Sequence, residues 1–482
     1  ALLDVLIVGA GISGISAACY LEKECPLVDY SIIEARDNSG GTWDLFRYPG
    51  IRSDSDMHTF GFSFKPWTDP KVLADGASIR EYVNEAIADY EIADKIQFGR
   101  KVISADWRED KSLWCVVIQE KSGETVEVET RILFMCAGYY DYDKGYTPEI
   151  PGLESFAGQR VHPQKWPKDL DYKNKKVAVI GSGATAMTLV PAMAPDAAKV
   201  VMVQRSPTYV ASRPRQDTLS NILNAILPAQ WAYDAVRWKN IRLQNYFYKK
   251  ARDNPKRIKA LLINQVRKNL PEGFAVDKHF TPSYNPWDQR VCLVPDGDLF
   301  KAIKSGKAEI VTGNIDAITE TGIRMVGGAE IEADILVTAT GLNLKLLGGT
   351  IFSMDGVDID FRDRFYYQGM MFSGVPNLIQ TFGYINASWT LRADLNSLFV
   401  SRLVNYMQQK NKTKVSAELV GDDRNMPAEN PFKDFQPGYM SRGLHMFPKQ
   451  GNHAPWQNTQ NYLLDKKLLG EANLEDGVLQ FS

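Results

Sequence analysis

Short apolar runs alternate with polar turns along the chain and predict two similar α/β units. Residues 4–9, Asp-Val-Leu-Ile-Val-Gly, form an apolar run that ends in glycine, which is typical of a buried parallel strand. The pattern that follows predicts a helix over 12–24 and a strand over 30–34. The same order returns later, with a strand, a helix and a strand expected at 177–180, 184–194 and 200–203.

Both units are expected to be discontinuous in sequence. The apolar runs 132–138 and 335–341 each end in glycine, and each is predicted to return the chain to its own sheet. Short strands joined by turns are expected over 310–337, and a long amphipathic helix over 390–410 is assigned to the first unit. The expected boundaries are 1–141 with 342–482 for the first domain, 150–206 with 289–341 for the second, and 207–288 for a helical insert in the second.

The composition narrows the class of protein. The chain has 482 residues, of which 44% are hydrophobic and 24% charged, and its formal net charge is −2. This balance is typical of a globular protein and excludes disorder, while the small net charge argues against a nucleic-acid partner. No apolar run reaches the ~18 residues of a membrane-spanning helix. The histidines and carboxylates show no metal-ligand spacing, so no metal is expected.

The number and spacing of the cysteines predict the cellular compartment. They are odd in number and scattered, and no C-x-x-C pair occurs. We therefore expect no structural zinc site, redox dithiol or disulfide framework. The same cysteine pattern predicts a reducing, cytoplasmic location. The cysteines stand at positions 19, 25, 115, 136 and 292.

A glycine-rich turn follows the first predicted strand. Gly9 permits the tight turn, Gly11 lets the backbone approach a pyrophosphate, and Gly14 lets the helix lie against the strand. The helix N-terminus then presents its free N–H groups to the phosphates. Glu34, at the end of the second strand, is placed to accept hydrogen bonds from an adenosine ribose. Together these signals predict a Rossmann-like dinucleotide-binding domain.

The second unit carries a related turn, Gly181-Ser-Gly183-Ala-Thr-Ala186. Alanine in the third position still allows close packing of helix and strand. Here the second strand ends in Gln204-Arg205-Ser206 in place of an acidic residue. The fold class is therefore α/β, with two Rossmann-like dinucleotide-binding domains.

The contrast between Glu34 and Arg205 predicts the cofactors. Glu34 lies 25 residues after Gly9 and Arg205 lies 24 after Gly181, so they occupy equivalent places with opposite charge. A carboxylate suits a free ribose hydroxyl, whereas an arginine suits a 2′-phosphate. We therefore expect FAD in the first domain and NADPH in the second. Because the chain has no redox cysteine pair, the flavin must pass electrons to an acceptor other than a disulfide, and molecular oxygen is the obvious one.

Two longer motifs point to one family. Segment 156–167 matches the pattern F-x-G-x-x-x-H-x-x-x-W-P, with His162 and Trp166 at its fixed positions. Segment 40–54 reads Gly-Gly-Thr-Trp-Asp-Leu-Phe-Arg-Tyr-Pro-Gly-Ile-Arg-Ser-Asp. Both resemble the fingerprints of the Baeyer–Villiger monooxygenases, and the order of parts resembles that family across nearly the whole chain. Segments 284–290 and 447–450 are similar to its ethionamide-activating group.

The resemblance implies a particular chemistry. FAD would be reduced by NADPH, and oxygen would be trapped as a 4a-peroxyflavin that attacks a carbonyl or a sulfur. Ketones would become esters or lactones, with sulfur oxidation as a side activity. The partners would thus be molecular oxygen and a small ketone or thioether.

The resemblance also assigns roles to residues. Arg290 matches the active-site arginine, and Asp54 is placed to orient its guanidinium, which would stabilise the anions formed on oxygen insertion. Gln289 replaces a lysine found in many relatives, which weakens the expected preference for NADPH over NADH. The expected FAD contacts are Gly9, Gly11, Ser13, Gly14, Glu34, Thr42, Trp43, Asp54 and Val102. Arg52, Ser53 and Asp54 would line the passage where nicotinamide meets flavin. The expected NADPH contacts are Gly181, Ser182, Gly183, Ala184, Thr185, Ala186, Met187, Arg205 and Ser206.

Two other functions fit part of this pattern. One is an N- or S-oxygenating flavin monooxygenase. Trp166-Pro167 and Arg290 favour the oxidation of ketones over this alternative. The other is an NADPH–flavin reductase that meets oxygen only by leakage. His162 and Trp166 lie between the two domains, and we expect a structural or gating role for the first and packing for the second.

The insert has an unusual composition. Residues 207–288 hold 14 Lys or Arg and 6 Asp or Glu, a local balance of +8 that leaves about −10 on the rest of the chain. The insert and residues 384–391 are expected to supply pocket walls. One interpretation of the insert is a helical cap with a solvated basic face, and the other is weak peripheral attachment to an anionic membrane surface. The alternating side chains are Trp231, Arg237, Trp238, Lys239, Arg242, Tyr246, Phe247, Tyr248, Lys249 and Lys250.

Overall fold

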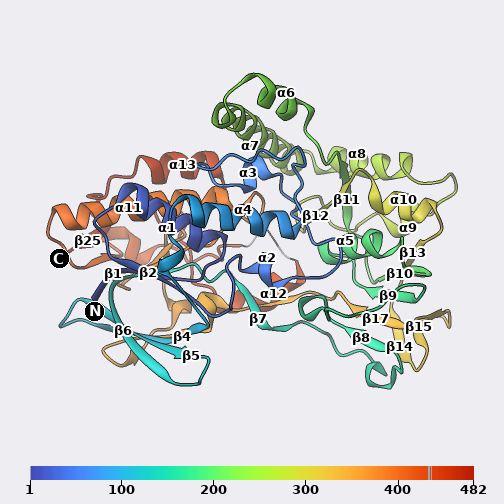
Figure 1. Ribbon diagram of the computed structural model, residues 1–482, viewed down its shortest axis with the longest axis horizontal. Helices are drawn as coiled ribbons and strands as arrows, with labels where there is room; N and C mark the ends of the chain where they lie inside the picture. Colours follow the sequence, from blue (N-terminus) through green and yellow to red (C-terminus); the bar gives the residue numbers. More distant parts are fainter. Residues whose placement is uncertain (1, 433–434, 436) are drawn as a thin grey trace.

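A computed structural model describes residues 2–432, 435 and 437–482. Two sheets lie on opposite sides of the molecule, and the green helices of the insert form its upper edge in Figure 1. Both chain ends lie beside the larger sheet.

The larger sheet is built around the first predicted unit. β1 (Leu2–Val8) pairs in parallel with β2 (Tyr30–Glu34) on one side and β6 (Thr125–Met135) on the other, with Val5 opposite both Tyr30 and Ile132. The strands predicted at 4–9, 30–34 and 132–138 are therefore confirmed. Across the sheet the order is β20 (Val357–Asp358), β19 (Ile351–Met354), β4 (Arg100–Arg108), β5 (Leu113–Glu120), β6, β1, β2 and β3 (Ile96–Phe98). β23 (Leu378–Gln380) also pairs with β6 and continues through β22 (Met371–Phe372) to β21 (Tyr366–Tyr367).

Helices cover one face of this sheet. α1 (Ile12–Glu24) occupies the predicted range, and it packs against α4 (Gly76–Asp89) and α11 (Trp389–Gln409), the long helix expected at 390–410. A buried hydroxyl of α1 ties it to α11, because Ser16 Oγ donates to Asp394 at 2.9 Å. The other face of the sheet packs around Trp107 and Trp114. A layer of helices thus holds the β1–α1 turn in place.

The second sheet contains only parallel pairs. Its order is β13 (Ala308–Thr312), β10 (Lys199–Gln204), β9 (Lys176–Ile180), β17 (Ile335–Thr338) and β8 (Gln159–Val161). The predicted strands at 177–180, 200–203 and 335–341 fall on β9, β10 and β17, and the predicted helix is α5 (Ala184–Met193). α5 and α10 (Asp298–Lys304) pack on one face. β14 (Ile315–Thr319), β15 (Gly322–Met325) and β16 (Glu330–Glu332) form a separate antiparallel layer on the other.

The insert differs from its expected purely helical pattern. It holds α6 (Thr218–Ile226), α7 (Ala229–Asp253), α8 (Pro255–Lys268) and α9 (Val276–His279). It begins, however, with β11 (Tyr209–Arg213), which pairs in parallel with β12 (Val291–Pro295). The helical expectation is wrong there because a five-residue strand has too little periodicity to be recognised, and its hydrogen-bond partners lie about 80 residues away.

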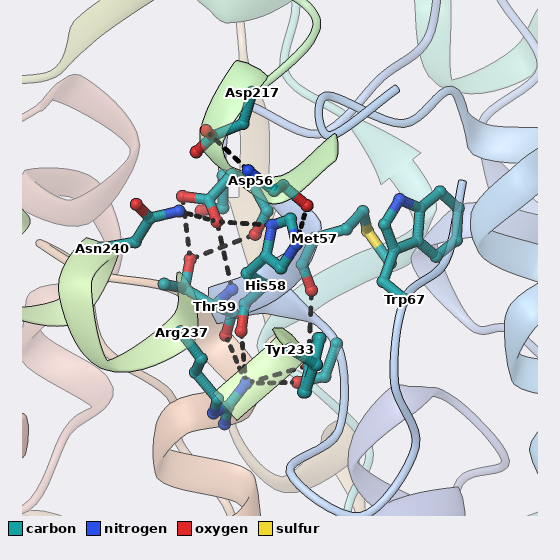
Figure 2. Close-up of polar contacts among 12 residues, drawn as sticks. Asp56, Met57, His58, Thr59, Trp67, Asp217, Tyr233, Arg237 and Asn240 are labelled. Carbon is teal, nitrogen blue, oxygen red and sulfur yellow. Dashed lines mark hydrogen bonds and ion pairs between the residues drawn. The ribbon is translucent and has the colours of Figure 1, made fainter. Parts of the chain in front are cut away.

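The expectation that Arg237 lies on a solvated basic face is also wrong. Its side chain is buried on α7, and Nη2 pairs with Asp394 of α11 at 3.3 Å. Nη1 donates to the carbonyl oxygen of His58 (Figure 2) and to that of Gly61, each at 2.8 Å. A buried guanidinium needs such partners, and here they come from the first domain. Arg237 therefore joins the insert to the first domain.

Among the described residues, no helix combines the length and apolar character that crossing a bilayer requires.

The remaining helices and strands connect these layers. The connecting helices are α2 (Thr42–Leu45), α3 (Met57–Phe60), α12 (Gly438–Gly443) and α13 (Tyr462–Gly470). The connecting strands are β7 (Tyr140–Gly145), β18 (Leu342–Leu344), β24 (Val415–Ala417) and β25 (Leu479–Phe481).

Candidate active site

One large cavity reaches residues of both domains and of the insert. Its volume is about 1060 Å³, at the upper end of the range for small-molecule and cofactor sites. It begins at the carboxyl ends of β1 and β2 and extends to Thr185 of α5 and Arg290 before β12. The expected walls are confirmed, since the insert supplies Leu243 and Phe247 and residues 384–387 line the same space. This placement follows the general rule that ligands bind at the carboxyl edge of parallel sheets.

The first glycine turn has the geometry that its residues predict. Gly9 has a φ of +106°, and a Cβ there would lie 2.6 Å from the carbonyl oxygen of Cys136. A Cβ on Gly14 would lie 1.8 Å from the carbonyl oxygen of Gly9, so only glycine lets α1 approach β1 so closely. Gly11 lines the cavity, and its backbone packs closely on that of Gly41, since a Cβ on Gly41 would lie 3.0 Å from the Gly11 Cα. With no side chain on either glycine, the turn fits the close approach of a pyrophosphate from the cavity.

Glu34 and Ser13 flank this turn. Glu34 Oε2 accepts from the backbone N–H of Ala10 at 2.7 Å, and Oε1 accepts from Arg36 N–H at 2.8 Å. Burial raises the pKa of Glu34, and the two backbone donors oppose the shift. Each oxygen retains a lone pair for a ribose hydroxyl. Ser13 Oγ accepts from the indole N–H of Trp389 at 2.7 Å, so its position is fixed by α11.

The segment 40–46 closes over the turn. Thr42 and Trp43 begin α2 and both line the cavity, and Thr42 Oγ1 lies 2.9 Å from the hydroxyl of Tyr142. Asp44, behind them, is buried and forms an ion pair with Arg36 at 2.7 Å. Val102 lines the cavity from β4, where the pairing with β5 shifts register. Eight of the nine predicted FAD contacts line this one cavity and fit that cofactor, whereas Gly14 packs α1 against β1 and does not line it.

Arg290 and Asp54 come together from positions far apart in sequence. Both line the cavity with Arg52 and Ser53, and both are half-buried. Burial raises the pKa of Asp54, while the charges of Arg290 and Arg52 oppose that shift. Among the described residues, Arg290 makes no hydrogen bond or ion pair. Its interaction with Asp54 is therefore a longer-range electrostatic attraction between the two charges. The contact by which Asp54 would orient the guanidinium is therefore absent, and the Arg290 charge is available to a ligand.

Sequence reasoning missed the aromatic surroundings of Arg290. The pKa of Arg290 is raised well above its ordinary value, chiefly by Tyr439 and also by Tyr140, Tyr139 and Asp54, against the opposing effect of burial. Tyr140 begins β7, a short loop after β6, and Tyr139 directly precedes it; the two share a hydrogen bond of 2.8 Å between their hydroxyls. Their place after Gly138, at the carboxyl end of a central strand, was the signal that could have found them. This environment keeps the guanidinium charged.

Arg52 is held differently from Arg290. Its Nη1 donates to Asp298 Oδ2 at 2.8 Å, an ion pair that links the segment after α2 to α10 of the second domain. Ser53 is buried, and its Oγ donates to the carbonyl oxygen of Ser55 at 2.8 Å. The Arg52 ion pair therefore joins this segment to the second domain at the wall of the cavity.

The second glycine turn meets the cavity only in part. Gly181 has a φ of +137°, and a Cβ there would lie 2.2 Å from the carbonyl oxygen of Ala339. A Cβ on Gly183 would meet nothing within 4 Å, so the space above this turn is open. Ala184 and Thr185 line the cavity. Ala186 and Met187 instead face the core of the second domain, and the Met187 N–H already bonds the carbonyl oxygen of Gly183.

The candidate residues for the 2′-phosphate lie at the surface beside this turn. Arg205 and Ser206 are both exposed. Ser182 Oγ donates to the Ser206 carbonyl oxygen at 3.0 Å, which fixes the end of β10 against the turn. Within the described part of the chain Arg205 makes no ion pair, so its guanidinium is available. The donor set fits a dinucleotide carrying a 2′-phosphate.

His162 is engaged on both ring nitrogens. Nε2 lies 3.2 Å from the carbonyl oxygen of Gly341, and Nδ1 accepts from the Gln164 N–H at 3.2 Å. These contacts suit a neutral ring with its proton on Nε2, and burial lowers the pKa of His162. Trp166 packs on the core of the second domain. His162 thus joins its own segment to Gly341, and its side chain does not line the cavity, although the neighbouring residues Lys165 and Leu342 do.

One dinucleotide turn lines the cavity, and a second reaches it through Ala184 and Thr185, an arrangement typical of a two-cofactor oxidoreductase. Residues 3–348 match the model of the flavin-binding monooxygenase-like family, and the chain belongs to that family. It is 52% identical to the FAD-containing monooxygenase EthA of Mycobacterium tuberculosis over 481 residues, which cover 100% of this chain and 98% of that protein. The probable FAD-binding monooxygenase AlmA of Acinetobacter baylyi is 47% identical over 480 residues, with coverage of 99% and 96%.

Solved structures show the same fold. An oxidized steroid monooxygenase bound to NADP superposes with a TM-score of 0.80 at 20% identity and covers 100% of this chain and 99% of its own. An ε-caprolactone-bound cyclohexanone monooxygenase gives a TM-score of 0.76 at 18% identity, with both chains fully covered. The predicted α/β fold is confirmed. The chain is an enzyme of the flavin monooxygenase kind, as its motifs predict, and the cofactor assignment agrees with FAD-containing relatives.

Proposed function

We propose that this enzyme uses NADPH and molecular oxygen to insert one oxygen atom into ketones, giving esters or lactones. The observation that carries the proposal is the position of Arg290. It is charged, has no partner among the described residues, and lines the same cavity as the first glycine turn and Thr185 of the second domain. Substrates are small ketones, with thioethers as secondary substrates.

The chain's own residues bind and align the reactants. The Gly9–Gly14 turn and Glu34 would hold FAD, which when bound supplies the redox chemistry and the activation of oxygen. The Gly181–Thr185 turn would hold the NADPH pyrophosphate, with Arg205 and Ser206 at the 2′-phosphate. Arg52, Ser53 and Asp54 would line the passage between the two, in reach of both domains.

Arg290 would supply the electrostatic part of catalysis. Oxygen insertion places negative charge on the carbonyl oxygen of the ketone as it is attacked. A guanidinium close by stabilises that charge and, because its pKa is raised, does not give up its proton near neutral pH. The tyrosines around it limit the access of water, which strengthens the interaction. No group with a pKa near 7 is needed for this role.

Product analysis tests the proposal. The holoenzyme is incubated with NADPH, oxygen and either a cyclic ketone or an aryl methyl thioether, and the products are identified by mass. We expect the lactone as the main product and the sulfoxide as a minor one. Sulfoxide or N-oxide formation without lactone would favour an N- or S-oxygenating enzyme instead. NADPH consumption that yields only hydrogen peroxide would favour a flavin reductase.

Replacing Arg205 by alanine is expected to weaken the use of NADPH but not of NADH. Loss of charge-assisted hydrogen bonds to a 2′-phosphate costs about 1.5–3 kcal/mol, or roughly 10- to 150-fold in kcat/KM for NADPH. Steady-state kinetics with both cofactors measures the ratio. Arg324→Ala, which removes an exposed arginine from β15 of the same domain, is the matched control and should change neither value. Equal losses with both cofactors would show that Arg205 does not recognise the 2′-phosphate.

The cellular location stays a prediction. We place the enzyme in the reducing cytoplasm on the basis of its scattered, unpaired cysteines. Peripheral attachment to a membrane depends on the surface of the insert, whose side chains are described next.

A further inference from the structure

α6 presents its apolar side chains to solvent. Leu219, Ile222, Leu223 and Ile226 follow the spacing of one helical face. In a globular protein such a face normally packs on the core. Here Ile222 and Ile226 are 54% and 70% exposed, and Leu219 is also exposed. The amphipathic helix is therefore turned with its apolar face outward.

Polar contacts hold α6 in this orientation. The one fully buried side chain of the helix is Ser220, whose Oγ lies 2.9 Å from Nε2 of His58. Asp217 caps the helix through the backbone N–H groups of Leu219 and Ser220 and pairs with Lys239 of α7 at 2.8 Å. Figure 2 shows His58 and Asp217 among the polar contacts of this region. Because Ser220 anchors the helix to the first domain and Asp217 anchors it to α7, the outward apolar face is a property of the fold.

The exposed apolar surface continues along α7 and α8. We call the whole of it the insert surface, and α6 and α7 form the upper edge of the molecule in Figure 1. Exposed apolar side chains concentrated on one group of helices are typical of an interaction site. Its exposed apolar members are Leu219, Ile222, Ile226, Trp231, Trp238, Leu243, Tyr246, Phe247 and Leu261.

Basic side chains lie among these apolar residues. The guanidinium of Arg242 stands 3.9 Å from the ring centre of Trp238, and the ammonium of Lys250 stands 5.7 Å from that of Tyr246. Lys249 is exposed beside them. The insert carries a charge balance of +8 in a chain whose remaining residues carry about −10. Tryptophan, tyrosine and aliphatic side chains combined with lysine and arginine suit the boundary of an anionic bilayer.

The cavity reaches the insert surface. Leu243 and Phe247 of α7 line the cavity and are also 46% and 48% exposed. Leu262 of α8 lines the same wall. Part of their exposed area faces this cavity, so the apolar wall of the cavity lies on the same two helices as the insert surface. An apolar molecule entering between these helices would stay in contact with apolar groups.

We propose that the insert surface docks on an anionic lipid bilayer and that apolar substrates enter the cavity from the lipid between α7 and α8. The charge asymmetry favours an anionic lipid surface, and the outward aliphatic face of α6 would be buried among the acyl chains. The entry route rests on the proposed ketone oxidation, whereas the docking itself does not. A second copy of this chain is the competing occupant, because its remaining surface is acidic.

Vesicle sedimentation tests the docking. The holoenzyme is mixed with vesicles of phosphatidylcholine, either alone or with about 30% phosphatidylglycerol, to vary the surface charge. Each mixture is measured at about 50 mM and about 500 mM salt to vary the screening of that charge. We expect binding only to the anionic vesicles and weaker binding at high salt. Two variants separate the contributions: Ile222→Ser/Ile226→Ser and Lys249→Glu/Lys250→Glu, each expected to bind at least tenfold more weakly.

Matched controls come from other surfaces. Val326→Ser/Val357→Ser removes two apolar side chains of similar exposure, and Lys168→Glu/Lys173→Glu reverses two exposed lysines outside the insert. These should bind as the unchanged protein does. All variants should keep their bound flavin and their turnover of a water-soluble ketone, which shows that they fold and keeps this test separate from that of the proposed function.

Each result of these experiments either supports or overturns the proposed docking. Loss of anionic binding in the two insert variants alone supports the docking. Absence of salt-sensitive binding, or equal loss in the controls, overturns it. A change in sedimentation velocity of the insert variants without any lipid binding assigns the surface to a second copy and also overturns it. For the entry route, a long-chain ketone held in anionic vesicles should be turned over faster than in neutral ones, and equal rates would overturn that part alone.

Discussion

Replacing Arg290 by alanine is expected to reduce ester or lactone formation by about 10²- to 10³-fold while NADPH oxidation continues. One lost electrostatic stabiliser of this kind costs ~3–4 kcal/mol in the barrier. NADPH binding should persist, because the Gly181 turn and Arg205 lie apart from Arg290. The electrons would then end in hydrogen peroxide. The measurement compares NADPH consumed, peroxide formed and product formed by the same holoenzyme.

Two variants sharpen this result. Arg290→Lys keeps the charge without the planar guanidinium and should recover part of the product yield. Asp54→Ala should reduce product more mildly and also slow flavin reduction, because Asp54 lines the passage between the domains and acts on Arg290 only through its field. Near-normal lactone formation by Arg290→Ala would contradict the active-site assignment.

Replacing Arg237 by methionine is expected to destabilise the enzyme by about 3–5 kcal/mol. The change leaves the buried carboxylate of Asp394 without its cation and the carbonyl oxygens of His58 and Gly61 without their donor. Each of these groups is costly to bury unpaired. Urea denaturation of the holoenzyme, followed by fluorescence, measures the loss of unfolding free energy.

An exposed neighbour and a double variant serve as controls. Arg242→Met removes an exposed arginine of the same helix and should cost less than about 0.5 kcal/mol. Arg237→Met with Asp394→Asn should be less destabilised than the sum of the two single variants, because the second change removes the unpaired charge. A cost below 1 kcal/mol for Arg237→Met alone would show that the buried pair does not join the insert to the first domain.

The pattern of hydrophobic and polar residues predicted the two βαβ units, with element bounds close to those of the structure. The helix predicted over 12–24 is α1, and the strand predicted over 30–34 is β2. These elements were predictable because strand, glycine turn and helix are each specified by adjacent residues. Gly14 shows the reason at atomic scale, since the close approach that it permits is to its own neighbour Gly9. The cofactor assignment was available for the same reason, because Glu34 and Arg205 stand at fixed intervals after their turns.

Only the tertiary structure decided which charged and apolar side chains are buried. Arg237 and Arg242 both lie on α7 and look alike in sequence, yet the first is 6% exposed and the second lies at the surface. The partner that distinguishes them, Asp394, is 157 residues away. The outward apolar face of α6 depends in the same way on Ser220 reaching His58. Burial is set by contacts between distant segments, and the local pattern of a helix does not contain them.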